Sequence, residues 1–187
     1  TGVQVCARPI WGLNWVGDLQ VNKTCDKAIV ALSEGDKDAL SDIFDCMARM
    51  IFSVAYGITG NYQDAENVLQ ETMIEISKYA HKYRRGSNAK AWILTMARHC
   101  SIDIVRKRKP IVSIEETMNM PDSKPDFTWI EVLDMLKTLD EEEKQCVIFR
   151  LYSKMPYKEI AEMMNITIAS AQKKYQRAIK KLKDYNS

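Results

Sequence analysis

Apolar residues recur at spacings of three and four along most of this chain from residue 24 onward, and no stretch alternates long enough to build a sheet. Such spacing gathers apolar side chains on one face of a helix. In residues 37–59 the stripe consists of Ile43, Phe44, Met47, Met50, Ile51, Val54 and Ala55. Glycine and proline, seven and five of 187 residues, interrupt the pattern rarely. The sequence therefore predicts an all-α fold.

Breaks in the helical pattern divide the chain into four parts. Residues 1–24 show no helical period and are predicted to be a weakly structured extension. A first helical domain is predicted for residues 25–109, with helices near 26–33, 37–59, 63–79 and 89–108. Pro110 and Pro121 interrupt residues 110–125, which we predict to be a flexible linker. A second helical domain follows at 126–187, with helices to 138 and over 140–152, 156–164 and from 168 onward.

Composition excludes several classes of protein. No apolar run reaches the roughly 18 residues that span a bilayer, and no basic segment precedes an apolar core as in a secretory signal. The five cysteines are odd in number and widely scattered without a C-x-x-C pair, which argues against a disulfide framework or a zinc site. We therefore expect a cytoplasmic protein with reduced thiols and no membrane insertion.

The sequence also lacks recognisable catalytic, nucleotide-binding and metal-binding motifs. Only two histidines occur, His81 and His99, and neither stands at a metal-ligand spacing or beside a P-loop or nucleophile motif. The sequence therefore predicts no catalytic residue, no metal and no cofactor.

The net charge of +2 conceals a strong segregation of charge along the chain. Residues 84–109 hold eight basic residues and one acid, and residues 150–187 hold nine basic residues and three acids. Between them, residues 113–143 hold ten acids and two lysines. Two basic blocks separated by an acidic one indicate two separate contacts with a polyanion.

Residues 156–182 have the pattern of a helix-turn-helix. Pro156 suits a helix start, Asn165 can take the left-handed conformation that ends a helix, and Thr167 can cap the next one. The second helix would face inward with Ala171, Tyr175, Ala178, Ile179 and Leu182 and outward with Gln172, Lys173, Gln176 and Lys180. Such a helix docks in the DNA major groove. The alternative is a helical hairpin with a lysine-rich solvated face.

Two longer stretches resemble a known family. LKTLDEEEKQCVIFRLYSKMPYKEIAEMMNITIASAQKKYQRAIKKL is similar to region four of bacterial RNA polymerase sigma factors. NYQDAENVLQETMIEISKYAHKY and SNAKAWILTMARHCSIDIVRKRK resemble their region two. The order and the short linker resemble the extracytoplasmic-function (ECF) group, over about residues 28–183. The resemblance implies a sigma factor that binds core RNA polymerase and promoter DNA and melts the promoter.

The acidic helix of the first domain corresponds, by this resemblance, to the family's polymerase contact. The resemblance implies that the clamp of the largest polymerase subunit is contacted by Asp64, Glu66, Gln70 and Glu71. Carboxylates and an amide on one helix face suit a basic helical partner. A solvated charged face is the alternative.

The basic loop and the following helix correspond to the elements that open DNA at the minus-ten element. The resemblance assigns this role to Tyr83, Arg84, Ser87, Asn88, Arg98, His99, Arg106, Lys107 and Arg108. His99 stands where many members carry asparagine, and imidazole offers other hydrogen-bonding groups than an amide. Trp92 could stack on a base, but it shares an apolar stripe with Met96 that favours a place in the core.

The helix-turn-helix corresponds to the reader of the minus-thirty-five element. Base-facing roles are implied for Gln172, Lys173 and Gln176, and phosphate-facing roles for Tyr157, Lys158, Lys174 and Arg177. Asn165 and Ala171 replace the glycine and valine of many members. An anti-sigma factor is a further partner that the resemblance implies. Two other readings remain: a stand-alone helix-turn-helix regulator, and a protein that mimics a sigma domain to sequester its regulator.

Overall fold

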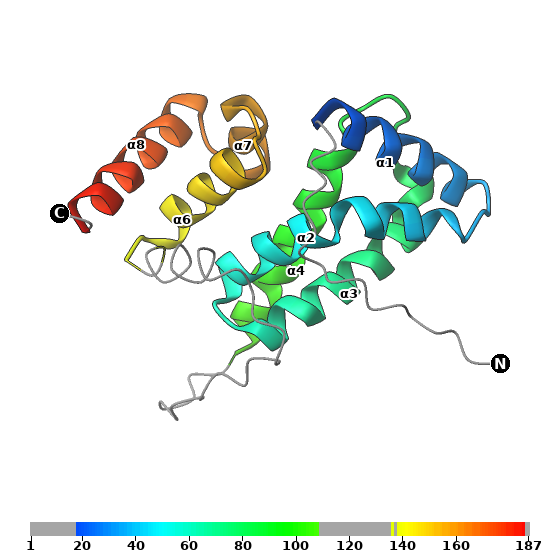
Figure 1. The fold of residues 1–187 in the computed structure, drawn as a ribbon, viewed down its shortest axis with the longest axis horizontal. Coiled ribbons are helices and arrows are strands. Elements are labelled where there is room, and N and C mark those ends of the chain that lie inside the picture. Colours follow the sequence, from blue (N-terminus) through cyan, green and yellow to red (C-terminus); the bar gives the residue numbers. More distant parts are fainter. Residues whose placement is uncertain (1–17, 109–135, 137, 186–187) are drawn as a thin grey trace.

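The computed structural model consists of two packed helical bundles (Figure 1) and describes residues 18–108, 136 and 138–185. The first bundle contains α1 (Asp18–Ser33), α2 (Ala39–Thr59), α3 (Tyr62–Tyr79), the 3₁₀ turn η1 (Ala80–Lys82) and α4 (Ala89–Lys107). The second contains α6 (Glu141–Val147), the π-helical turn η2 (Ile148–Tyr152), α7 (Tyr157–Met164) and α8 (Ile168–Tyr185). These described residues contain no strand, and the predicted all-α class is confirmed.

Helix α2 lies at the centre of the first bundle and packs against α1, α3 and α4. Its apolar stripe is completely buried at Ile43, Met47, Ile51 and Val54. The helix ends at Gly60, whose φ of 65° lies in the left-handed region that glycine adopts at little cost.

Short polar residues fix where α3 and α4 begin. The side-chain oxygen of Asn61 accepts a hydrogen bond from the Asp64 N–H at 2.9 Å, at the start of α3. The Asn88 side chain accepts one from the Ala91 N–H at 3.0 Å, at the start of α4. Each bond satisfies a backbone donor that has no partner within its own helix.

Helix α1 begins at Asp18, eight residues before the predicted start near residue 26. Val21, Cys25, Ala28, Ile29 and Leu32 form a buried stripe at helical spacing, so burial against α2 extends the helix. The prediction of an unstructured segment as far as residue 24 is therefore wrong for its last seven residues. Residues 1–17 lie outside the described part of the chain.

The second bundle is built on α6, whose start is capped by Asp140 through a 2.8 Å hydrogen bond from the Glu143 N–H. Phe149, Met155 and Ile160 fill its core together with Ala171 and Ala178 of α8. The predicted helix over 140–152 is α6 continued by η2. The predicted linker 110–125 and the predicted helix over 126–138 lie outside the described residues, apart from positions 136 and 138.

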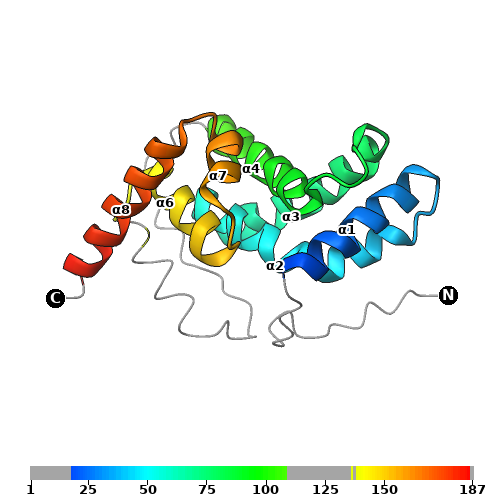
Figure 2. The same cartoon turned by 90° about the horizontal axis from the view of Figure 1, so that it is seen from above.

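The two bundles share one apolar core. Figures 1 and 2 show α6 beside α2, and buried residues from both bundles form a single continuous cluster. Where α2 meets η2, Gly57 lies against the Ile148 side chain, and a Cβ on Gly57 would overlap Ile148 Cδ1. The sequence predicted two bundles, but this contact between them was not predicted.

Candidate nucleic-acid interface

Helices α7 and α8 and the turn between them form the predicted helix-turn-helix. Asn165 ends α7 with φ 54° and ψ 48°, the left-handed conformation expected for it. The Thr167 hydroxyl accepts a hydrogen bond from the Ser170 N–H at 3.1 Å and so caps α8. The predicted left-handed conformation of Asn165 and the predicted cap at Thr167 are both confirmed, because each depends on near neighbours in the chain.

The outer face of α8 is polar and cationic. Ala171 and Ala178 are fully buried, which turns the opposite face of the helix to solvent. The exposed residues on it are Gln172, Lys173, Gln176, Arg177 and Lys180, and Lys158 is exposed on α7. Amides and cations on an open helix can reach base edges and phosphates.

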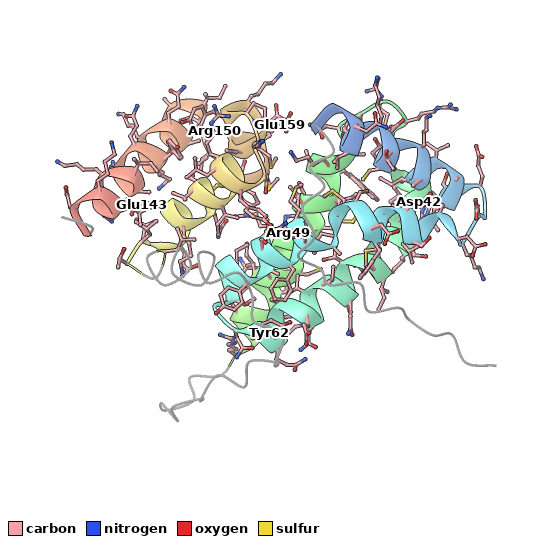
Figure 3. All side chains as sticks on the ribbon, viewed as in Figure 1. Asp42, Arg49, Tyr62, Glu143, Arg150 and Glu159 are labelled. Carbon is pink, nitrogen blue, oxygen red and sulfur yellow. The ribbon has the colours of Figure 1, made fainter. Side chains whose placement is uncertain are left out.

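Two lysines of α8 instead contact the acidic start of α6. Lys174 forms an ion pair with Glu142, and its hydrogen bond to that carboxylate raises the pKa of Lys174. Lys181 Nζ lies 2.6 Å from Oε2 of Glu143, a carboxylate that is only 2% exposed and lies between α6 and α8 (Figure 3). Lys174, a predicted phosphate contact, is thus engaged within the bundle.

The Tyr157 ring packs against Tyr175 and Arg150. The ring lies edge-on to Tyr175 with centroids 5.8 Å apart, and the Arg150 guanidinium carbon lies 4.8 Å from the Tyr157 centroid. These contacts join α7 to α8 and to η2, so Tyr157 also positions the helix-turn-helix.

The basic loop between η1 and α4 is held by α1. Asp26 Oδ1 accepts hydrogen bonds of 2.7 Å from both the Tyr83 hydroxyl and the Gly86 N–H, and Asn22 accepts one of 3.1 Å from the Lys90 N–H. Burial, with the bond to Asp26 and its charge, raises the pKa of Tyr83 to about 12. The sequence did not reveal that Asp26 and Asn22 hold the loop, because they lie 57 to 68 positions from their partners in the chain.

Within this loop the predicted site residues have different environments. Arg84 is exposed, Ser87 is half-buried, and Asn88 is exposed while its side chain caps α4. The Tyr83 ring lies 5.2 Å from that of Trp92, measured between centroids, and both rings pack against the core. Trp92 therefore has the core position that its helical stripe favoured.

The predicted minus-ten residues in the second half of α4 and directly after it fall into two groups. His99, Arg106 and Lys107 are exposed. Arg98 Nε donates a 2.8 Å hydrogen bond to Gln145 of α6, and burial lowers the pKa of Arg98. Arg108 forms an ion pair with Asp64 and donates from Nη1 to the Thr59 carbonyl at 3.0 Å. Arg98 and Arg108 were predicted to contact DNA, but in the structure both side chains bind other residues of the chain.

One acidic residue of α3, Glu66, lines an apolar groove. Asp64 is paired with Arg108, Glu71 is exposed, and Glu66 and Gln70 line an open groove of about 500 Å³. Its other walls are Leu40, Ser41, Phe44, Leu69, Met73 and Ile74. Phe44, a member of the predicted apolar stripe, is 43% exposed, and Ile74 is 58% exposed. A carboxylate and an amide beside exposed apolar side chains suit a protein partner.

Neither metal ligation nor membrane insertion finds support in the described residues. Across 18–108 and 136–185, excluding 137, no three His, Cys, Asp or Glu side chains gather where they could hold an ion. Over the same ranges, no helix combines the length and the apolar character needed to cross a bilayer.

Two family models match the chain, one on each bundle. Sigma-70 region 2 matches residues 43–111, and Sigma-70, region 4 matches residues 129–182. The first therefore covers most of α2 and all of α3 and α4, and the second covers α6, α7 and most of α8.

Curated relatives include three bacterial sigma factors. The chain is 31% identical over 84 residues to the ECF RNA polymerase sigma factor SigW of Bacillus subtilis, an alignment that covers 45% of each protein. It is 27% identical over 152 residues to SigM of the same organism, covering 77% of this chain and 93% of SigM. It is 23% identical to RNA polymerase sigma factor CarQ of Myxococcus xanthus, covering 81% and 91%.

Two solved structures share the fold. CnrH in complex with the cytosolic domain of CnrY has a TM-score of 0.68 at 14% identity, covering 87% of this chain and 96% of CnrH. The sigma factor RpoE in complex with the anti-sigma factor NepR from Bartonella quintana has a TM-score of 0.69 at 20% identity, covering 79% and 96%.

Proposed function

The chain belongs to the extracytoplasmic-function sigma factors of the sigma-70 family, and we propose that its first bundle docks on core RNA polymerase and opens the minus-ten element while its second bundle reads the minus-thirty-five element. As a sigma factor it directs transcription initiation and is not an enzyme. The observation that carries the proposal is the match of region 2 and region 4, in that order, to two separate bundles.

Helix α8 is the proposed reader of the minus-thirty-five element. Gln172, Lys173 and Gln176 are exposed on one face near the beginning of the helix, which is the part that a recognition helix places against base edges. Lys158 and Arg177 would contact phosphates. Lys174 would reach a phosphate only after it leaves Glu142.

Helix α3 and its groove are the proposed polymerase contact. Glu66 and Gln70 line the groove and Glu71 is exposed on the same helix, while Phe44 and Ile74 supply exposed apolar surface. A basic helical partner with apolar residues at the same spacing would complement both parts.

The loop and α4 are the proposed minus-ten surface. Melting costs about 1.4 kcal/mol per base-pair step. A flipped base held in a pocket and phosphates held by cations offset much of that cost. Arg84, His99, Arg106 and Lys107 are exposed and supply these contacts. Arg98 would join them only after it leaves Gln145.

A protein regulator is a further proposed partner. The solved structures of CnrH and RpoE contain CnrY and the anti-sigma factor NepR. By analogy we propose that an anti-sigma factor binds this chain over the groove beside α3 and so blocks the polymerase contact. Purified candidate regulators should then lose affinity when Phe44 or Ile74 is replaced by serine.

Runoff transcription with core polymerase on a promoter library tests the proposed function. Start sites that depend on this chain support it, and their sequence alignment should show two conserved elements. DNA binding that needs no polymerase, without start sites, would favour the stand-alone regulator. Neither start sites nor DNA binding would favour the protein that sequesters a regulator.

A further inference from the structure

Two cysteines that are 21 positions apart in the sequence meet between α1 and α2. Cys25 Sγ and Cys46 Sγ lie 3.1 Å apart, and both thiols are free. A disulfide needs about 2.05 Å between sulfurs, so closure requires a movement of about 1 Å. Sequence reasoning missed the pair because neither cysteine belongs to a short motif.

The two thiols differ in exposure and environment. Cys25 is completely buried, whereas Cys46 is half-buried. The hydrogen bond from Cys25 lowers the pKa of Cys46, against burial and the nearby carboxylates of Asp42 and Asp45. The same bond and burial raise the pKa of Cys25. Figure 3 shows Asp42 on the part of α2 that runs beside α1. A half-buried thiol with a lowered pKa beside a second thiol is the arrangement of redox-sensitive cysteine pairs.

We propose that Cys25 and Cys46 form a modification site at which hydrogen peroxide converts the two thiols into an intramolecular disulfide. The Cys46 thiolate attacks one peroxide oxygen, the S–O bond forms, and the O–O bond breaks to release hydroxide, which becomes water. The Cys25 thiol then attacks the sulfenic sulfur, the S–S bond forms and the S–O bond breaks, and the thiol proton passes to the departing hydroxide, which leaves as the second water. Two thiols and one peroxide give one disulfide and two waters, with sulfur oxidised and peroxide oxygen reduced.

The disulfide would tie α1 to α2 next to the basic loop. Asp26, the neighbour of Cys25, holds the loop through Tyr83 and Gly86. A covalent link at Cys25 therefore fixes the helix on which this loop rests. This consequence concerns the first bundle alone and does not depend on promoter recognition.

Peptide mapping of the full-length reduced chain after treatment with hydrogen peroxide tests the proposal. After alkylation of the remaining thiols, trypsin cleaves behind Lys23, Lys27, Lys37 and Arg49. Mass spectrometry should detect peptide 24–27 linked to peptide 38–49. Cys100→Ser, a change at another half-buried cysteine, should keep the link, and Cys46→Ser should abolish it.

Two further measurements make the outcome decisive. Cys25→Ser, or Cys25→Ala if serine prevents folding, should leave a sulfenic acid on Cys46 that dimedone traps. The oxidised wild-type chain should unfold at a higher temperature than the reduced chain, with no such shift in Cys46→Ser. Peroxide consumption without the 24–27 to 38–49 link, or a link that uses Cys6 or Cys100 instead, would overturn the proposal.

Discussion

Replacing Gly57 by alanine should weaken the packing of the two bundles although alanine favours the helix itself. Gly57 lies inside α2, and its missing side chain leaves the space that Ile148 of η2 occupies. A Cβ at position 57 would overlap Ile148 Cδ1 and lie 3.2 Å from Cγ1. The buried Ile148 side chain must therefore move, or the bundles must separate slightly.

Helix propensity and overpacking change the stability of Gly57→Ala in opposite directions. Alanine in place of an interior helical glycine stabilises by about 1 kcal/mol. Overpacking a buried contact costs roughly 1–3 kcal/mol, so Gly57→Ala should lower the free energy of unfolding by about 1 kcal/mol in sum. Ile148→Val removes Cδ1 at a cost of about 1 kcal/mol. In the double variant the clash is relieved, so stability should return nearly to that of the wild type, a coupling of about 2 kcal/mol.

Urea unfolding of the four proteins, followed by circular dichroism, measures this coupling. Small-angle scattering on the same samples reports whether Gly57→Ala increases the radius of gyration. If Gly57→Ala instead stabilises the chain by about 1 kcal/mol and its effect adds to that of Ile148→Val, the two bundles do not pack at this point in solution. The shared core would then be refuted, while the separate bundles would stand.

Three other perturbations test individual residues. Gln172→Ala with Lys173→Ala should reduce promoter discrimination by about 5- to 150-fold per lost base contact while polymerase binding persists. As a control in the same transcription and binding assays, replacing the exposed Lys37 by alanine should change neither promoter discrimination nor polymerase binding. Glu71→Lys should weaken binding to core polymerase in a titration with labelled chain, unlike Glu34→Lys on the loop after α1; equal affinities would exclude α3 as the contact. The pKa of Tyr83 is raised from 10.0 to about 12, so its neutral hydroxyl is favoured in the folded state, and its contribution to stability is complete below pH 10 and lost as the pH rises to about 12. Chemical unfolding across this pH window should show that loss, and Tyr83→Phe should reduce it; an unchanged pH profile would show that Tyr83 does not cause it.

Features that depend on near neighbours could be predicted from the sequence. The stripe of Ile43, Met47 and Ile51 specifies a helix because its spacing matches the helical repeat. The left-handed Asn165 and the capping Thr167 act within four residues, so the helix-turn-helix followed from its own segment. The start of α1 was missed because Val21 alone extends the stripe, and its burial depends on α2.

Pairings between distant residues were decided by the tertiary structure alone. Charge patterning predicted two basic surfaces, but it could not show that Arg98 contacts Gln145 or that Lys174 contacts Glu142, because helical spacing does not fix which helices become neighbours. The same holds for the meeting of Cys25 with Cys46 and for the contact of Gly57 with Ile148. Local periodicity determines the elements and their inward faces, whereas close packing of those faces determines which side chains meet.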